Sequence, residues 1–386
     1  MEKVKLNELC DINIGKTPSR SKKQFWGQGY NWLAISDLKE KFITDTKEEI
    51  TELAIKDCNM KLVPKNTVVM SFKLSIGKTA ILKKDMYTNE AIANFQIKDN
   101  NKIIPEYLYY AIKTLDFTNT DRAVMGATLN KSKLNEIVIP YCDLNKQIKI
   151  VDTLDKAQHL IDLKMEQLEL LDELVKSRFI EMFGSQPDSK RGWKIAKIGD
   201  IVTDVRYGTS KSSVIGGKYP YIRMNNITYE GELDLRDLKY IDISDDELEK
   251  CIVRKGDVLF NRTNSIDLIG KTCVFNLEEP MIIAGYIIRI RLKEQVLPVY
   301  LSMFLNSDYG KQLLKSIAKG AVNQANINAQ ELKSIKISIP PIELQNQFAD
   351  FVTQVDKLKF EMEKSLKELE DNFNSLMQKA FKGELF

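Results

Sequence analysis

Two short motifs contain residue types that could bind a nucleotide cofactor. The segment 25–29 (Phe-Trp-Gly-Gln-Gly) fits the loop with which methyltransferases bind adenosylmethionine, but that loop follows an apolar strand, and a polar segment precedes it here. Gly77-Lys78-Thr79 and Gly270-Lys271-Thr272 resemble the end of a phosphate-binding loop, yet Phe72 and Ser265 stand where its first glycine belongs. We expect a surface loop at the first motif and turns that enter strands at the other two.

Residues for metal, acid–base or nucleophilic chemistry are scarce. His159 is the only histidine, and the five cysteines are scattered, whereas structural zinc needs four Cys or His ligands at paired spacings. The chain has no Asn-Pro-Pro-Tyr or Asp-Pro-Pro-Tyr segment to hold a target amine, and Pro187-Asp188 lies in an apparent linker without a nuclease motif around it. We expect no catalytic residue, no metal site and buried free thiols.

Composition is typical of a soluble globular protein, with 43% apolar and 29% charged residues. No apolar run is long enough to cross a membrane, and residues 1–5 lack the apolar core of a signal peptide, so we expect a cytoplasmic protein without a membrane partner. Segments 145–183 and 342–386 carry more Asp and Glu than Lys and Arg, although the formal net charge is +3. The basic excess therefore lies outside these segments, where a polyanion could bind.

The strongest signal is an internal duplication of residues 1–188 in residues 189–386. The matching segments follow one order: 12–19 with 205–212, 32–38 with 221–227, 63–71 with 253–261, 76–80 with 269–273, 105–108 with 298–301, 126–127 with 320–321, and 137–140 with 337–340. Such agreement at a nearly constant offset predicts two homologous domains.

Within each repeat the pattern is α+β. Residues 67–72 and 256–261 are short apolar runs that predict strands, and residues 281–292 read as one longer strand. Pro105 and Pro298 should begin helices, Gly320 could end the second of these, and Ser244 with Glu247 has capping-box spacing.

After Pro140 and Pro341 the apolar spacing changes to alternating steps of three and four, which predicts two long helices. The seam residues are Val151, Leu154, Ile161, Met165, Leu168, Val175, Phe179 and Met182, with breaks at Gln158 and Asp172, and then Phe348, Val352, Val355, Met362, Leu366, Leu369, Phe373, Leu376 and Ala380. Each apolar stripe needs a partner helix, so we expect the two helices to pair antiparallel, with one domain at each end.

The remaining polar and basic side chains form loop clusters that occur in both repeats. Such side chains can contact phosphates and base edges, so the clusters are more informative than any single member. The candidate DNA-binding residues are Lys16, Thr17, Ser19, Arg20, Lys22, Lys23, Lys73, Ser75 and Lys78 in the first repeat, and Arg206, Tyr207, Lys211, Arg223, Asn225, Asn226, Arg262, Asn264, Lys271, Lys319, Asn323 and Gln324 in the second.

The duplicated glycine loops at Gly15 and Gly208, the Trp32–Leu38 segment, the Ile-Gly-Lys-Thr turns and the Ile-x-Ile-Pro segments before heptad helices resemble type I restriction-modification specificity subunits. The resemblance covers both halves of the chain. It differs from the family before the long helices, where the usual Pro-Pro-Leu-x-Glu-Gln keeps its glutamine as Gln147 and Gln347 but loses its glutamate.

The resemblance implies an α+β fold: two repeated α/β target recognition domains separated by a pair of long antiparallel coiled-coil helices with pseudo-two-fold symmetry. The expected boundaries are 1–142 for the first domain, 143–184 for the central spacer helix, 185–341 for a linker and the second domain, and 342–386 for the C-terminal spacer helix. It further implies a non-catalytic subunit that binds double-stranded DNA, two modification subunits and restriction subunits. Adenosylmethionine, ATP and Mg are expected in those partners and no cofactor in this chain.

Two other functions predict different behaviour. A self-sufficient methyltransferase or nuclease would bind adenosylmethionine or cleave DNA alone, which the missing motifs disfavour. A coiled-coil scaffold would have negligible, salt-insensitive DNA affinity, whereas binding dominated by phosphates falls steeply with salt. The basic excess in the duplicated domains favours DNA recognition.

Overall fold

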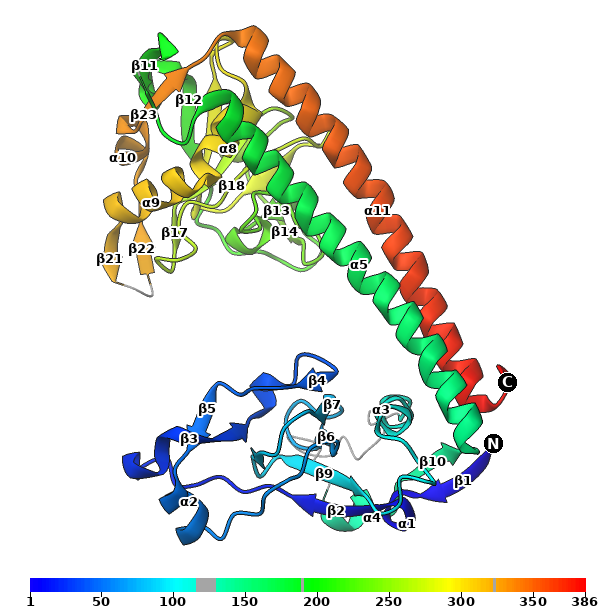
Figure 1. Cartoon of the computed structure of the whole chain (residues 1–386). Coiled ribbons are helices and arrows are strands. Elements are labelled where there is room, and N and C mark those ends of the chain that lie inside the picture. Colours follow the sequence, from blue (N-terminus) through cyan, green and yellow to red (C-terminus); the bar gives the residue numbers. More distant parts are fainter. Residues whose placement is uncertain (116–129, 189–190, 322–323) are drawn as a thin grey trace. The chain divides into compact units, whose positions relative to one another are not determined.

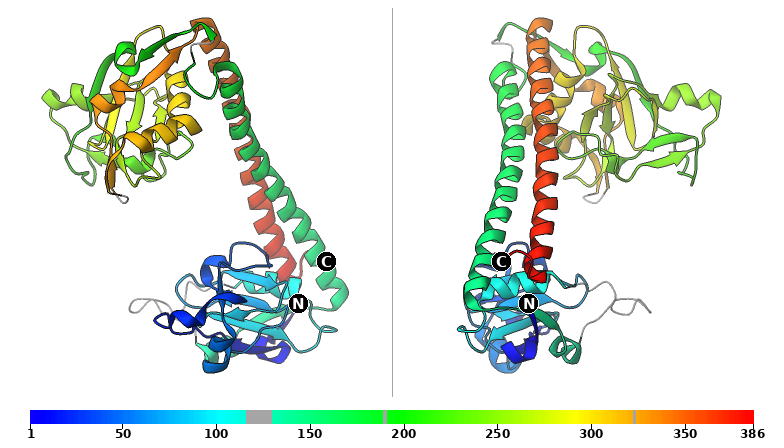
Figure 2. Two further views of the ribbon diagram at one scale, coloured as in Figure 1. Left: turned by 60° about the vertical axis from the view of Figure 1, so that its left-hand side comes forward. Right: turned by 90° about the vertical axis from the view of Figure 1, so that its right-hand side faces the viewer.

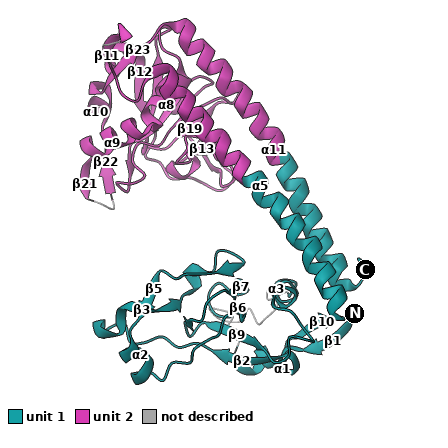
Figure 3. Ribbon diagram, viewed as in Figure 1, with its two compact units in different colours: residues 1–165, 364–386 teal, residues 166–363 magenta. Residues whose placement is uncertain are grey.

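The structure, a computed structural model, describes residues 1–115, 130–188, 191–321 and 324–386. These residues form two compact units: unit 1 is Met1–Met165 with Lys364–Phe386, and unit 2 is Glu166–Glu363 (Figure 3). Each unit combines strands with helices, so the α+β class is confirmed. The matched pair at 126–127 lies outside the described residues.

Unit 1 is built on a five-stranded sheet in the order β2-β9-β6-β7-β4, with a three-stranded sheet β5-β3-β8 beside it. Its strands are β1 (Glu2–Lys5), β2 (Cys10–Ile14), β3 (Trp26–Leu33), β4 (Phe42–Ile43), β5 (Glu48–Ile50), β6 (Val68–Ser71), β7 (Thr79–Leu82), β8 (Tyr87–Thr88), β9 (Ile92–Ile97) and β10 (Val138–Tyr141). Its helices are α1 (Leu6–Leu9), α2 (Glu52–Asp57), α3 (Pro105–Lys113) and α4 (Lys131–Asn135), joined by parts of α5 (Leu144–Phe183) and α11 (Ile342–Lys382).

Unit 2 repeats this plan with a four-stranded sheet β12-β20-β16-β18 and a second sheet β14-β13-β19-β15. Its strands are β11 (Lys194–Lys197), β12 (Val202–Tyr207), β13 (Tyr219–Ile222), β14 (Lys239–Ile241), β15 (Ile252–Val253), β16 (Val258–Asn261), β17 (Thr263–Asn264), β18 (Thr272–Val274), β19 (Met281–Ile283), β20 (Ile287–Leu292), β21 (Lys319–Ala321), β22 (Gln324–Asn326) and β23 (Lys336–Ile339). Its shorter helices are α6 (Ile198–Ile201), α7 (Asp245–Cys251), α8 (Pro298–Asn306), α9 (Asp308–Ile317) and α10 (Ala329–Ser334).

Both faces of each main sheet are buried, which explains the continuous apolar runs. In unit 1, Val68 and Met70 pack toward α3 and the long helices, while Val69 packs on the opposite face with Leu33. In unit 2, Phe260 packs toward α8, and Leu259 packs on the opposite face. Successive side chains of a strand point to opposite faces, so four residues of β6 or β16 serve two core layers.

The two long helices pair antiparallel within each unit (Figure 1, Figure 2). In unit 1 the start of α5 shares a core with the end of α11, through Leu154 and Ala380. In unit 2 the end of α5 meets the start of α11, where the rings of Phe179 and Phe348 lie 5.5 Å apart. The predicted pairing of the helices is therefore confirmed.

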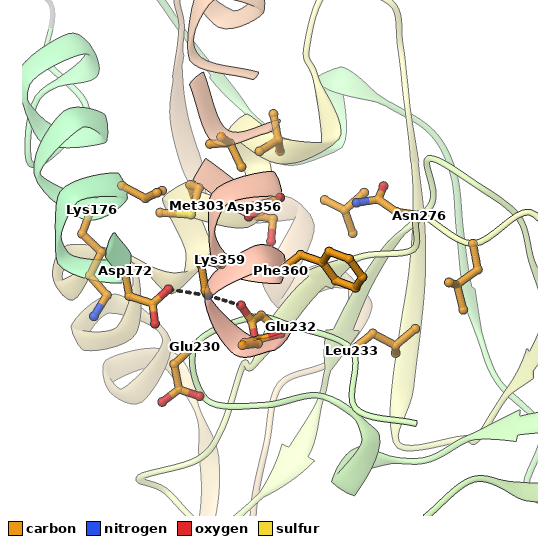
Figure 4. A pocket seen from close by; sticks show the side chains of 18 residues that line it. Asp172, Lys176, Glu230, Glu232, Leu233, Asn276, Met303, Asp356, Lys359 and Phe360 are labelled. Carbon is orange, nitrogen blue, oxygen red and sulfur yellow. Dashed lines mark hydrogen bonds and ion pairs between the residues drawn. The ribbon is translucent and has the colours of Figure 1, made fainter. Parts of the chain in front are cut away.

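The predicted seam is wrong at one position: Met165 is 48% exposed. Between Ile161 and Phe179 no α5 side chain is fully buried, so the middle of this helix contributes little apolar packing. The predicted break at Asp172 is filled by an ion pair, because Lys359 Nζ of α11 lies 2.7 Å from Asp172 Oδ1 and 2.6 Å from Glu232 Oε1 (Figure 4). Burial disfavours the charged form of Lys359, but its hydrogen bonds to Asp172 and Glu232 outweigh burial and raise its pKa.

Several local predictions hold. Helices begin at Pro105 and Pro298, and strands β7 and β18 start directly after the two Gly-Lys turns. Helix α7 begins after Ser244 as expected, but the Ser244 side chain forms no capping hydrogen bond to the helix backbone. Three others are wrong. The segment 25–29 enters strand β3 and is not a loop, since Gly29 lies against the backbone of Ile50 and forms part of a bulge in β3, the central strand of the sheet β5-β3-β8.

The second error is the stop at Gly320. Helix α8 ends at Asn306 instead, because Ser307 Oγ accepts a hydrogen bond from Gly310 N at 3.1 Å and begins a new helix, α9. Gly320 lies in β21 with a φ of 122°. The third error is the single strand over 281–292, which is two strands, β19 and β20, in different sheets, separated by a turn.

Candidate nucleic-acid interface

Each unit contains one glycine that brings a loop against a neighbouring strand. A Cβ on Gly15 would lie 2.1 Å from Thr88 O, and a Cβ on Gly208 would lie 2.1 Å from Ile283 O. The following residue in each case donates a backbone hydrogen bond to that same oxygen, Lys16 N at 2.8 Å and Thr209 N at 2.9 Å. This close backbone contact leaves no room for a side chain at Gly15 or Gly208. The two loops therefore start at equivalent positions in their units.

An aromatic side chain then fixes each glycine loop to strand β3 or β13. Trp32 Nε1 donates a 3.0 Å hydrogen bond to Lys16 O, and Tyr221 OH donates a 2.9 Å hydrogen bond to Lys211 O. Trp32 is fully buried and Tyr221 is 4% exposed. The two repeats thus use different residues for one task, which is to hold a basic loop rigid.

The candidate loops of each unit follow the same ends of the main sheet. In unit 1, β2 and β6 run antiparallel to β9, with Ile14 opposite Ala93 and Ser71 opposite Ile92. The loops after Ile14 and after Ser71 therefore leave the sheet at one end. Because β12, β16 and β20 are arranged alike in unit 2, the loops after Tyr207 and Asn261 also leave at one end. Residues far apart in sequence are brought together there.

In unit 1 the first loop is ordered by an arginine that packs against two tryptophans. The guanidinium carbon of Arg20 lies 3.8 Å from the ring centroid of Trp26 and 5.1 Å from that of Trp32, and Nη2 is 2.8 Å from Glu48 Oε2. The hydrogen bond from Arg20 lowers the pKa of Glu48. Sequence reasoning missed both tryptophans, although two tryptophans on one strand could have indicated a stacking site.

The other members of this cluster are mostly exposed. Lys16 Nζ donates to Cys58 O at 3.2 Å, Lys22 lies 4.8 Å from the Phe25 ring, and Ser19 Oγ is 2.8 Å from Ser21 Oγ. Lys23 is exposed, and Thr17 is half-buried.

The loop after β6 is held by the fully buried Ser71. Its hydroxyl donates to Ser75 O and accepts from Lys78 N at 3.1 Å. Lys78 and Ser75 are exposed, and Lys73 Nζ lies 5.4 Å from the Phe72 ring. Leu74, at the tip, is 90% exposed with a φ of 62°. This hydrogen-bonded turn exposes Lys78 and Leu74 to solvent, with Lys73 half-buried beside them.

In unit 2, three segments meet around Tyr207. Its hydroxyl accepts from Ala329 N at 2.8 Å, and the guanidinium carbon of Arg262 lies 5.0 Å from its ring centroid. Asn264 of β17 pairs with Ala325 of β22. Gln324, in the same hairpin, is exposed, and Asn323 lies outside the described residues. The structure therefore gathers candidates from the first, middle and last parts of the repeat.

Three basic members of unit 2 form surface ion pairs. Arg206 Nε lies 2.8 Å from Asp204 Oδ1, and Lys319 Nζ lies 2.6 Å from Glu331 Oε1. Lys211 pairs with Glu247, whose hydrogen bond raises the pKa of the lysine. Exposed pairs of this kind are weak, so a phosphate could replace the carboxylate.

Three candidate side chains of unit 2 form hydrogen bonds within the fold. Asn226 is 1% exposed, accepts from Arg223 N at 2.9 Å and donates to Asp234 O at 2.8 Å. Lys271 is 8% exposed and donates to Met224 O at 2.8 Å, and burial lowers its pKa. Arg223 Nη2 donates to Asp237 Oδ2 at 2.8 Å, whereas the neighbouring Asn225 is exposed. The hydrogen bonds of Asn226, Lys271 and Arg223 support the turn that carries Asn225.

Within the described residues, no group of three or more His, Cys, Asp or Glu side chains is arranged to hold a metal ion. A search of the same residues for a helix long and apolar enough to cross a membrane finds none.

The sequence matches the family described as "Type I restriction modification DNA specificity domain" over residues 1–173 and 190–371. Because these two matches cover most of the chain, this protein belongs to that family. The repeat of one family domain agrees with the duplicated framework of the two units.

Two of the relatives are similar over part of their length. The chain is 28% identical to the MjaIX type I restriction enzyme specificity subunit of Methanocaldococcus jannaschii, over 61% of this chain and 62% of that protein. It is 25% identical to the EcoKI specificity subunit of Escherichia coli, over 67% of this chain and 61% of that protein. The matches thus span about three fifths of the length of each relative.

The fold is also similar to a solved chain from work on complex assembly and conformational transition of the type I restriction-modification system. That comparison has a TM-score of 0.63 at 17% identity and covers 100% of this chain and 98% of the solved one. The similarity extends over both units and both long helices.

Proposed function

We propose that this chain is the sequence-specific DNA recognition subunit of a type I restriction-modification complex. Each unit reads one half of a bipartite target in double-stranded DNA, and the long helices set the spacing between the halves and dock two modification subunits. The observation that carries the proposal is the gathering of basic and amide side chains at one end of the main sheet in both units, in a chain that belongs to this family.

The side-chain chemistry of these loops suits duplex DNA. Arg262, Asn264 and Gln324 can form hydrogen bonds with base edges, while Lys22, Lys23 and Lys78 can contact phosphates. The two sets differ, because Trp26 and Arg20 of unit 1 have no counterpart in the tyrosine-centred cluster of unit 2. The two half-sites should therefore differ in sequence.

Helix α5 offers a surface for protein partners. Within unit 2, Leu170 and Leu174 are 60% and 47% exposed and lie one helical turn apart on the same side of the helix. Exposed leucines on one side of a helix form a typical docking surface for another helix. We assign it to the modification subunits.

In this proposal the chain is non-catalytic and works in the cytoplasm. Methyl transfer with adenosylmethionine belongs to the modification subunits, and ATP hydrolysis and Mg-dependent cleavage belong to the restriction subunits. Supporting this division, the relatives of this chain are named as specificity subunits.

The test uses the chain in complex with its modification subunits and maps methylated sites in genomic DNA. Arg262→Ala should relax one half-site and leave the other unchanged, with a loss of about 1–3 kcal/mol in discrimination, as for a lost base contact. Arg254→Ala is the matched control, because Arg254 is exposed but precedes β16, at the other end of the strand. Unchanged methylation in Arg262→Ala, or equal effects of both variants, would contradict the proposed interface.

A further inference from the structure

Unit 1 contains a cavity of about 490 Å³ beside β2 and β9, next to the glycine loop. Asn94 of β9 lines it and is 3% exposed. Its Nδ2 donates a 3.0 Å hydrogen bond to Thr88 Oγ1, but its buried Oδ1 has no hydrogen-bond partner. Buried polar atoms without a partner are rare and costly, so this oxygen favours a ligand that donates an N–H or O–H group.

Apart from the amides of Asn13 and Gln96, the remaining lining is basic and apolar. Lys16, Lys61 and Lys131 contribute three positive charges, and no Asp or Glu lines the cavity. None of the three lysines forms an ion pair with a carboxylate of the described residues. Met60 and Leu62 belong to the apolar part of the wall. The ligand should therefore be an anion with an apolar, flat or compact part.

In the second unit, a longer side chain occupies the matching position. Asn94 pairs with Val69 in β6, and the matching position opposite Leu259 in β16 is Arg289. Arg289 is 1% exposed, its Nη2 lies 2.6 Å from Asp204 Oδ2, and Nη1 donates to Ile252 O. Unit 2 thus fills the space with a guanidinium group whose two terminal nitrogens are hydrogen-bonded, although its Nε has no partner, whereas unit 1 has a shorter side chain and an unpaired acceptor.

From this contrast we infer that the cavity beside Asn94 binds a nucleotide whose base offers an amino group to Asn94 Oδ1 and whose phosphate lies among Lys16, Lys61 and Lys131. Its volume falls within the range of small-molecule sites, about 300–1,000 Å³. The nucleotide could be free or part of a DNA strand, because both sources present the same base and phosphate. The inference goes beyond the proposed function, since it does not depend on the partner subunits.

The experiment titrates the full-length chain with the fluorescent monophosphate of 2-aminopurine deoxyriboside and measures anisotropy. We expect saturable binding, and we expect inorganic phosphate to compete at least about tenfold more weakly, because it cannot satisfy Asn94 Oδ1. Asn94→Arg should weaken nucleotide binding at least about tenfold by filling the cavity. Unit 1 offers a carboxylate partner for an arginine at position 94. Asp11 lies opposite Gln96 in the sheet, just as Asp204 lies opposite Arg291 in unit 2, so the two aspartates occupy matching positions.

Asn101→Arg is the matched control, because it makes the same change at an exposed position of unit 1. Asn94→Leu, similar in size but without the acceptor, provides a second variant if Asn94→Arg does not fold. No saturation at about 10 mM nucleotide, or equal affinity in wild type and both Asn94 variants, would show a cavity that holds solvent only and would overturn the inference.

A second arm identifies the source of the nucleotide. If a 2-aminopurine-containing DNA strand binds more tightly than the free nucleotide and loses this advantage in Asn94→Arg, the natural ligand is a nucleotide within DNA. If only the free nucleotide responds to Asn94→Arg, the site serves a free nucleotide. Failure of duplex recognition in wild type would contradict the proposed function while leaving the nucleotide arm intact.

Discussion

At the scale of single residues, two buried glutamines hold the corners where strands β10 and β23 lead into the long helices α5 and α11. Gln345 Oε1 accepts from Leu297 N at 2.8 Å, and its Nε2 donates to Pro340 O at 2.9 Å and Gln295 O at 3.1 Å. Gln147 makes the same three kinds of bond, with Ile104 N, Cys142 O and Lys102 O. Both side chains are 0% exposed.

The structural match therefore pairs Gln147 with Gln345, and the sequence match of Gln147 with Gln347 is wrong by two residues. The same shift appears in the strands, where Tyr107 OH donates to Pro140 O and Tyr300 OH donates to Ser338 O. A shift of two keeps every side chain on its face of a strand, so the apolar pattern could not distinguish the two alignments.

This pairing predicts opposite outcomes for neighbouring glutamines. Gln345→Leu leaves three buried backbone groups without partners and should lower the free energy of unfolding of unit 2 by about 2–4 kcal/mol. Gln347→Leu, at an exposed position, should change it by less than about 0.5 kcal/mol. Urea denaturation of each variant measures both, and equal effects would contradict the corner assignment.

A second residue-scale prediction concerns Lys359. Lys359→Met removes its bonds to Asp172 and Glu232 and should destabilise unit 2 by about 1–3 kcal/mol, a modest value because both partners are partly exposed. Lys357→Met, exposed on the same helix, is the control.

The pH dependence of this effect has a definite sign. Because the pKa of Lys359 is raised above its ordinary 10.5 in the folded chain, its stabilisation is complete below that pH and is lost as pH rises through the folded pKa. The stability difference between wild type and Lys359→Met should thus stay constant from pH 6 to about 9 and shrink in stronger alkali. A difference that disappears near neutral pH would argue against the assigned charge state.

At the scale of elements, α5 has two different sides. Val151, Leu154 and Phe179 face the cores of the units, while the leucines at 160, 163, 170 and 174 remain exposed. Heptad spacing predicted the first side correctly at these positions. Heptad spacing also assigned Met165 to the buried side, although this side chain is exposed. Near its middle the helix pair has little apolar packing, so the spacing of apolar residues there does not indicate which side is buried.

The exposed side leads to a prediction about assembly. Leu170→Glu should leave folding unchanged but weaken association with the modification subunits about tenfold or more, because a charge would enter an apolar contact. Glu169→Gln, an exposed position at least about 100° around the same helix from these leucines, should have little effect. Co-purification and analytical ultracentrifugation of the complex measure association, and full assembly by Leu170→Glu would exclude this surface as the docking site.

At the scale of the whole molecule, the proposed function makes helix length set the gap between half-sites. Deleting residues 162–168 and 363–369 together removes one heptad from each helix, about 10 Å of rise. We expect methylation mapping to find both half-site sequences unchanged and the gap shortened by about 3 bp. A changed half-site with a constant gap would contradict the role of the helices as a spacer.

The amino-acid sequence by itself determined the duplication, the α+β class, the two long helices and the turns that carry the basic loops. These features depend on local apolar periodicity and on glycines such as Gly15 and Gly208, whose backbone contacts admit no other residue.

Only the tertiary structure decided which polar side chains remain available to a ligand. Lys271 and Asn226 resemble their exposed neighbours in sequence, yet each is buried by segments distant in the chain, and Arg289 fills a space that stays open beside Asn94. Long-range packing sets these differences, because burial of a loop side chain depends on what folds over it rather than on the residues beside it.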